Sequence, residues 1–240
     1  MTDPLPAGRY GPRVRPLTVA HRTASARLHQ EILDGEFLAR FGPGFLRRYH
    51  RAWIDSPGGL ALGAFDEEGV LVGVLLGAVD PSAHVAAMVL EHGVGLAGRL
   101  LVAAVVRPRL AHELAVTRGT RYASGLWRTM GRPAVRRLAC FHRPAIGGGF
   151  PSPVEARTGP RSGEVTHLLV VPAQQGRGVG RTLLHAAEEL AQQAGLDELV
   201  LVTPPDQAAR GFYERLGWSP DGALTSRSGE AFVRYRYRLG

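Results

Sequence analysis

Three alternating glycines mark the segment of this chain best suited to chemistry. Gly176, Gly178 and Gly180 follow a run of apolar residues and directly precede a helical pattern. Glycine lets the backbone adopt positive φ and approach a ligand closely, so several N–H groups and a helix N-terminus can converge on phosphate oxygens. Arg177 and Arg181 add positive charge at the same turn. The spacing therefore predicts a site for an anion such as a diphosphate.

The loop does not fit two other phosphate-binding patterns. A nicotinamide dinucleotide site uses Gly-x-Gly-x-x-Gly after the first strand of a βαβ unit, with an acidic residue about twenty positions later. Here the form is Gln-x-x-Gly-x-Gly after several predicted strands, and Asp197 comes just before another strand. All 29 basic side chains are arginines. Without lysine, a Walker-type phosphate loop and Schiff-base chemistry are excluded.

The elements that position this loop predict a mixed α/β domain. Runs of apolar and β-branched residues indicate strands, and apolar residues at intervals of three and four indicate helices. Strands are expected at residues 14–19, 60–65, 71–79, 164–171, 198–203 and 231–239, and helices at 20–33, 37–54 (in two pieces), 178–194 and 207–216. Residues 1–12 are expected to be a disordered tail, and residues 13–240 a single domain.

A second motif lies about thirty residues after the loop. Residues 206–218 read DQAARGFYERLGW, which matches Asn-x-x-Ala-x-x-aromatic-Tyr-x-x-x-Gly-aromatic except that Asp206 replaces the asparagine. Together with Gln175 to Gly180, this motif resembles the GNAT superfamily of acyl-CoA-dependent N-acyltransferases. The resemblance is strong over residues 164–239 and extends to 14–79. It implies a mixed central sheet with splayed fourth and fifth strands, helices on both faces, and acetyl-CoA as co-substrate.

The resemblance also implies where acetyl-CoA binds. In the family the pantetheine arm lies along the fourth strand like an added strand, which here implicates Leu168, Leu169 and Val170. The other implied contacts belong to the loop and the second motif: Gln175, Gly176, Arg177, Gly178, Val179, Gly180, Arg181, Asp206, Ala209 and Phe212. A carboxylate has no amide donor, so Asp206 removes or reverses a hydrogen bond that asparagine makes in relatives.

The implied chemistry is direct attack of a neutral amine on a thioester. It needs a base for the ammonium proton, a donor for the oxyanion and an acid for the thiolate. Tyr213 matches the family's general acid, and its alternative is an aromatic ring packed beside Phe212. The oxyanion donor is expected to be the N–H of Leu169 or Val170.

Glu164 is the expected base, because the family places its base at this separation from the glycine loop. Strand alternation predicts that Glu164 shares a face with Thr166, Leu168 and Val170. The alternatives are a solvated carboxylate and a base formed by a chain of waters. His167 is expected on the opposite face, packed or at the surface.

Residues 82–143 are predicted to be a helical insertion, followed by a flexible connector over 144–162. Between Ala97 and Arg143 stand ten arginines and one acid, a local charge of +9 in a chain whose total is +8. Three uses stay open: a lid over an anionic acceptor, an amphipathic surface for anionic lipid, and an interface between copies of the chain, which is the simplest. A nucleic-acid clamp is disfavoured because few aromatics are interleaved.

The composition indicates the cellular location of this expected N-acetyltransferase and whether it contains disulfides or metal sites. No apolar run reaches the roughly 18 residues of a membrane span, and the first twelve residues lack the apolar part of a secretory signal, so the cytosol is expected. The single cysteine, Cys140, excludes an internal disulfide. The histidines show no spacing typical of a metal site, so none is expected. The alternative function is an inactive acyl-CoA-binding sensor or scaffold.

Overall fold

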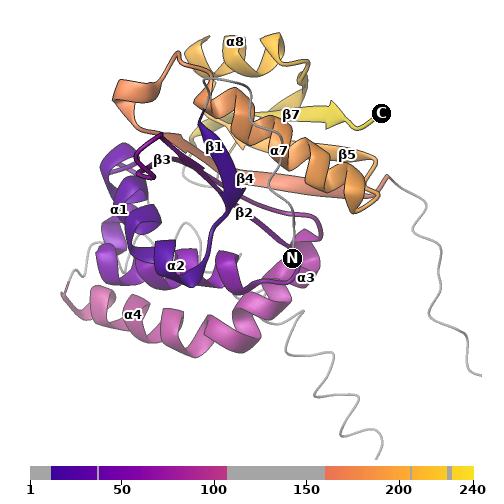
Figure 1. The fold of residues 1–240 in the computed structure, drawn as a ribbon. Helices are drawn as coiled ribbons and strands as arrows, with labels where there is room; N and C mark the ends of the chain where they lie inside the picture. The colour runs from indigo at the N-terminus through magenta and orange to yellow at the C-terminus, as the bar shows by residue number, and fades with distance from the viewer. Residues whose placement is uncertain (1–11, 37, 107–159, 206, 226–228) are drawn as a thin grey trace, which may run out of the picture.

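The strands assemble into a seven-stranded mixed sheet in the order β1-β2-β3-β4-β5-β7-β6 (Figure 1). The computed structural model describes residues 12–36, 38–106, 160–205, 207–225 and 229–240. The strands are β1 (Arg13–Pro16), β2 (Gly59–Phe65), β3 (Leu71–Ala78), β4 (Ser162–Val170), β5 (Glu198–Thr203), β6 (Ser219–Thr225) and β7 (Ala231–Arg238). Each neighbouring pair is antiparallel except β4 and β5, which are parallel. The predicted mixed α/β class is confirmed.

Helices cover both faces of this sheet (Figure 1). The α-helices in the described ranges are α1 (Arg22–Ile32), α2 (Pro43–Asp55), α3 (Pro81–Ala87), α4 (Gly93–Val106), α7 (Val179–Gln193) and α8 (Gln207–Arg215). Shorter 3-10 or π turns occur at Val19–His21, Ala39–Phe41, Met88–His92 and Pro172–Gln174. Helices α1 and α2 pack on one face, α7 packs on the other, and α4 packs against α2. None of these helices is long and apolar enough to cross a bilayer.

Two apolar clusters join the helices to the sheet. On the α7 face, Leu183 and Leu184 are fully buried against side chains of β2 and β3. On the other face, the apolar side of α2, which includes Leu46 and Trp53, is buried, as expected for an amphipathic helix. Burial of one leucine side chain contributes about 1.5 to 3 kcal/mol. Helix α7 is therefore held firmly, and the loop at its N-terminus is fixed with it.

Strands β4 and β5 are paired over only part of their length. Residues 162–165 of β4 are in register with 198–201 of β5, whereas β4 continues to Val170. Along β5, all six residues are also paired with β7 on the other side. Within the described part of the chain, β4 thus has no β5 partner from Thr166 onward. The splayed fourth and fifth strands implied by the resemblance are confirmed.

Several predicted boundaries were wrong. Strand β1 ends at Pro16, and the chain turns through Val19–His21 instead of continuing extended. Strand β4 starts at Ser162, inside the expected connector. In the described part of the expected insertion, the chain forms α3 and α4, with a π turn between them. Residues 107–159 and the tail at 1–11 lie outside the described residues.

Strand β6 was not predicted at all. Its sequence contains Pro220, Asp221 and Gly222, which disfavour strands. It forms the edge of the sheet beside β7, where Asp221 pairs with Arg236 at 2.8 Å and with Arg234 at 3.3 Å. Tertiary pairing therefore outweighs local propensity in this strand.

Candidate functional site

The glycine loop lies between the end of β4 and the start of α7. Gly176 has φ of 74° and Gly178 has φ of 87°, both in the left-handed region that favours glycine. Gly178 is the N-cap of α7, and Thr182 N–H donates to the carbonyl of Gly178 at 3.0 Å. The N–H groups before Thr182 in the first turn have no acceptor within the helix, so they can bind an anion.

Two side chains anchor this loop. Val179 is buried under the sheet with only 2% of its surface exposed. Gln175 donates from Nε2 to the carbonyl of Val170 at 3.0 Å, which ties the loop to the end of β4. Arg177 and Arg181 are exposed, so their charges are available to a ligand at the loop. The predicted loop is thus a turn anchored by Gln175 and Val179, with two exposed cations beside it.

The main chain of β4 faces two directions in alternation. Val171 N–H donates to the carbonyl of Val72 at 3.0 Å, so the main-chain groups of Val171 face β3. By strand geometry, Val170 and Leu168 then direct their N–H and C=O groups away from β3, toward the gap left by β5. Leu169 directs its N–H and C=O groups toward β3. Of the two expected oxyanion donors, only Val170 faces the gap.

A β-bulge interrupts this strand. The register with β3 pairs Leu76 with His167 but pairs the next residue, Gly77, with Val165. Thr166 is therefore the extra residue on β4. On the far side of a bulge, each residue lies on the opposite face of the sheet from the one that simple alternation predicts.

The bulge overturns the predicted face of Glu164. Glu164 pairs with Ala78, whose side chain packs in the cluster under α1 and α2. His167 faces the same helices, and its ring bonds to a tyrosine of α2. Glu164 thus shares a face with His167, while Leu168 and Val170 pack with the α7 cluster. The expectation failed because simple alternation assumes a strand without an extra residue.

Helix α8 joins the second sequence motif to the first. A methyl group at Gly180 would lie 3.2 Å from Cζ of Phe212, so the α7 N-terminus and α8 are in contact. Tyr213 is half-buried, with ring centroids 5.1 Å from Phe212, 6.1 Å from Trp218 and 5.7 Å from Tyr235. Ala209 is half-buried on the same helix, and Asp206 lies outside the described residues. The two motifs, about thirty residues apart in sequence, meet in space.

Comparison with known families gives this arrangement its identity. Residues 144–218, which contain β4, the glycine loop, α7, β5 and α8, match the acetyltransferase (GNAT) family. Over these residues the chain matches that family, which confirms the resemblance predicted from the sequence.

Solved structures of acetyltransferases have a similar fold over nearly the whole chain. A histone acetyltransferase HPA2 and related acetyltransferase from Corynebacterium glutamicum is 18% identical with a TM-score of 0.53, covering 96% of this chain and 97% of that one. The ribosomal-protein-S18-alanine N-acetyltransferase of Escherichia coli is 11% identical with a TM-score of 0.51, covering 95% and 93%. A polyamine N-acetyltransferase of Drosophila melanogaster is 16% identical with a TM-score of 0.52, covering 94% and 99%. No curated protein sequence matches the chain.

A chain of buried, hydrogen-bonded histidines connects α1 to α2 inside the protein. Ser25 Oγ lies 2.5 Å from His50 Nδ1, and His50 Nε2 lies 2.9 Å from His29 Nδ1. His29 Nε2 lies 2.7 Å from Glu36 Oε2. Both histidines are fully buried. No spacing in the sequence links these residues, so sequence analysis missed them.

His167 of β4 lies beside this chain. Its Nε2 is 3.0 Å from the hydroxyl of Tyr49, and its ring centroid is 4.8 Å from that of His29. Burial lowers the pKa of His167 to about 4. Burial, followed by the neighbouring imidazoles of His29 and His167, lowers the pKa of His50 well below its usual value. These two rings are therefore neutral at physiological pH.

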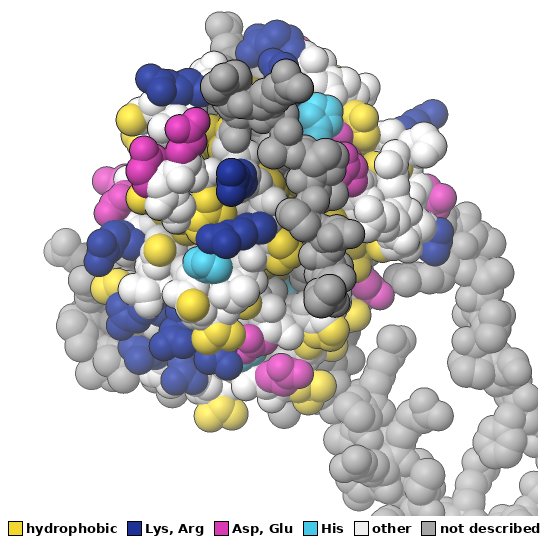
Figure 2. Space-filling view, in the orientation of Figure 1, with side chains coloured by type: hydrophobic (Ala, Val, Ile, Leu, Met, Phe, Trp, Pro, Cys, Tyr) yellow, Lys and Arg dark blue, Asp and Glu magenta, His cyan; other side chains and the backbone are white. Residues whose placement is uncertain are grey.

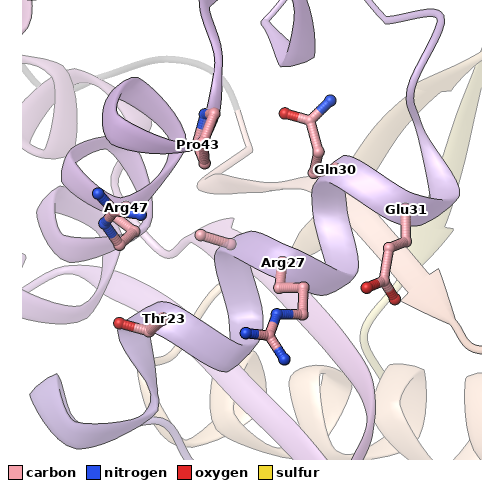
Figure 3. Close-up of a pocket in the computed structure, with 7 residues that line it drawn as sticks. Thr23, Arg27, Gln30, Glu31, Pro43 and Arg47 are labelled. Atoms are coloured by element: carbon pink, nitrogen blue, oxygen red, sulfur yellow. The ribbon is translucent and has the colours of Figure 1, made fainter.

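A separate pocket lies between α1 and α2 (Figure 3). Its lining residues are Thr23, Ala26, Arg27, Gln30, Glu31, Pro43 and Arg47. Figure 2 shows basic side chains gathered on one part of the molecular surface. Between α2 and α4, Arg48 lies against Gly95 and Arg99 against Gly44. No residue of β4, α7 or α8 lines this pocket, so it is distinct from the glycine-loop site.

Proposed function

We propose that this chain is an N-acetyltransferase that transfers the acetyl group of acetyl-CoA to a primary amine by direct attack. The acceptor class is a small molecule or a peptide. The observation that carries the proposal is that the α7 glycine loop, the edge of β4 beyond Val165 and α8 meet at one place. This arrangement fits a long ligand with a diphosphate at one end and a thioester at the other.

The glycine loop is the proposed cradle for the diphosphate. Positions 176 and 178 have positive φ and open space where a side chain would begin, so nothing blocks phosphate oxygens from the backbone amides. Arg177 and Arg181 would neutralise the phosphate charge. The remaining proposed contacts of this region are Gln175, Val179, Gly180, Asp206, Ala209 and Phe212.

The open edge of β4 is the proposed binding site of the pantetheine arm. Leu168 and Val170 direct main-chain groups toward the gap, where an extended ligand can bond as an added strand. The side chain of Leu169 packs under the helices and supports the strand from behind. The Val170 N–H is the proposed donor to the oxyanion that forms at the thioester carbonyl.

Glu164 and Tyr213 are the proposed base and acid. The base takes the ammonium proton, after which the amine nitrogen forms a bond to the carbonyl carbon and the carbon–sulfur bond breaks. Tyr213 gives its hydroxyl proton to the departing thiolate, and the second proton that the nitrogen loses as it becomes an amide returns to Tyr213 through solvent. Residues of one strand, β4, and one helix, α8, thus divide the three tasks of the reaction.

The alternative is a sensor or scaffold that binds acyl-CoA without turnover. Asp206 favours it, because a carboxylate stands where relatives carry asparagine. Release of coenzyme A thiol in the presence of an amine panel separates the two functions. The panel includes polyamines and peptides with N-terminal alanine, the acceptor types that the names of two structural neighbours give. Thiol release with any of these amines supports the enzyme, and tight binding without release supports the sensor.

The proposed setting is the cytosol, which agrees with the single Cys140. The proposed partners are acetyl-CoA, the amine acceptor and a second copy of the chain. The insertion is the proposed interface between copies. Its helix α4 packs on α2 and brings Arg99 against that helix. Contact with anionic lipid is the alternative for this basic segment.

A further inference from the structure

Three side chains from two distant parts of the sequence bring possible metal-ligand atoms close together. One such atom each from His29, Glu36 and His167 lies within 4.8 Å of the other two. His29 belongs to α1, Glu36 follows that helix, and His167 belongs to β4. Two imidazoles and a carboxylate form a donor set suited to zinc and its transition-metal neighbours, whereas magnesium and calcium prefer oxygen ligands alone.

Each histidine of this group already has a partner for its other ring nitrogen. His29 Nδ1 is 2.9 Å from His50 Nε2, and His167 Nε2 is 3.0 Å from the Tyr49 hydroxyl. Histidines that bind metal use their second nitrogen in this way, which fixes the ring and its tautomer. In this arrangement His29 would bind through Nε2, the atom that now contacts Glu36, and His167 through Nδ1.

Counting protons shows that the hydrogen bonds among Ser25, His50 and His29 can form both with and without a metal. Without a metal, His29 Nε2–H donates to Glu36, His50 Nε2–H donates to His29, and Ser25 donates to His50. With a metal on His29 Nε2, both rings change tautomer: His29 donates from Nδ1 to His50, and His50 donates from Nδ1 to Ser25. No hydrogen bond between the rings is lost, so the chain of histidines is ready for either state.

Burial favours strong binding and still leaves an entry path. His29 is fully buried and His167 is 8% exposed, so water competes little for the ligand atoms. The side chain of Glu36 is 33% exposed and connects the group to solvent. Its negative charge offsets part of the charge of a divalent ion.

We propose that His29, Glu36 and His167 bind one divalent transition-metal ion of the zinc type. The ion would join α1, the segment after it and β4, with at least one coordination position left for water. This site does not depend on acetyl-CoA, and the function proposed above does not require the metal.

The test is a zinc titration of the full chain, freed of metal by a chelator and carrying no affinity tag. In competition with a chromophoric chelator, we expect one zinc per chain, no displacement by magnesium, and visible absorption bands when cobalt replaces zinc. Glu36→Gln should weaken zinc binding strongly, while Glu31→Gln, an exposed carboxylate on α1, should not. Tyr49→Phe, which removes the partner of His167, should weaken it by about 10- to 100-fold.

Two results would overturn the site. One is the absence of zinc binding by the wild-type chain, which would leave a hydrogen-bonded histidine cluster only. The other is zinc binding that Glu36→Gln and His29→Ala leave unchanged, which would place the ion elsewhere. Glu36 is partly exposed, so its variant is expected to fold even where a change at a buried histidine unfolds the chain. A coenzyme A titration of the same samples keeps this result separate from that of the proposed function.

Discussion

At the scale of single residues, Tyr213 has the most specific proposed role. Its ring packs between Phe212, Trp218 and Tyr235, so the packing that its sequence context suggested is present. The proposed acid role rests on the hydroxyl alone, which the packing does not require. The ring and the hydroxyl can therefore be tested apart.

Tyr213→Phe should keep the ring and remove the proton donor. We expect coenzyme A affinity to stay within about twofold, while turnover falls about 100-fold, as for loss of a general acid. Tyr237→Phe is the matched control, because it removes a hydroxyl from the same aromatic region and should change neither quantity. Equal loss of affinity and turnover in Tyr213→Phe would assign the residue to packing.

At the scale of elements, the glycine loop was predictable because its cause is local. Alternating glycines specify positive φ wherever the rest of the fold lies, and Gly176 and Gly178 adopt it. The face of Glu164 was not predictable, because the bulge at Thr166 arises from pairing with β3. Strand β6 was missed for a similar reason, since its pairing with β7 overrides Pro220 and Gly222.

Gly178→Ala tests the loop as an element. Alanine in the left-handed region costs about 1 to 2 kcal/mol, and the backbone shift that relieves it should misalign the amides of the first turn. We expect coenzyme A affinity to fall at least about tenfold, the equivalent of one charged hydrogen bond. Gly69→Ala is the control, with φ of 80° and open space in the turn between β2 and β3. It should lose similar stability and keep full affinity, and a parallel loss of affinity would contradict the cradle.

Helix α3 contains a buried histidine that should make stability depend on pH. His84 stacks on Trp53 with ring centroids 3.7 Å apart, and burial lowers the pKa of His84 to about 4. Neither ring nitrogen has a hydrogen-bond partner among the described residues. As pH falls below 6.5, the His84 ring binds a proton in the unfolded chain but not in the folded chain. Stability should therefore fall between pH 6.5 and 4, by up to about 3 kcal/mol from this residue.

His84→Phe should keep the stacked ring and remove this titration. Urea unfolding of metal-free protein at a series of pH values should show a shallower loss of stability in the variant across that window. His185→Gln, a half-exposed histidine on α7, should follow the wild type. A wild-type slope in His84→Phe would mean that His84 does not resist protonation in the folded chain.

At the scale of the whole molecule, the fold could be predicted further than the site. Two linked motifs over 164–239 were enough for the family, and the splayed strands followed from it. The cluster of His29, Glu36 and His167 could not be predicted, because three elements bring it together only after the sheet and its helices have packed. The spacing of apolar residues predicts which face of a helix or strand is buried, but it does not predict which polar side chains come into contact inside the fold.

The central claim is that the turn between β4 and α7 holds a diphosphate and so brings a thioester to α8. Isothermal titration of the full chain with coenzyme A tests it most directly. We predict one site per chain, weaker binding as salt rises because Arg177 and Arg181 face the phosphates, and a marked loss in Gly178→Ala. The absence of heat with both coenzyme A and acetyl-CoA, on protein shown to be folded, would contradict the claim.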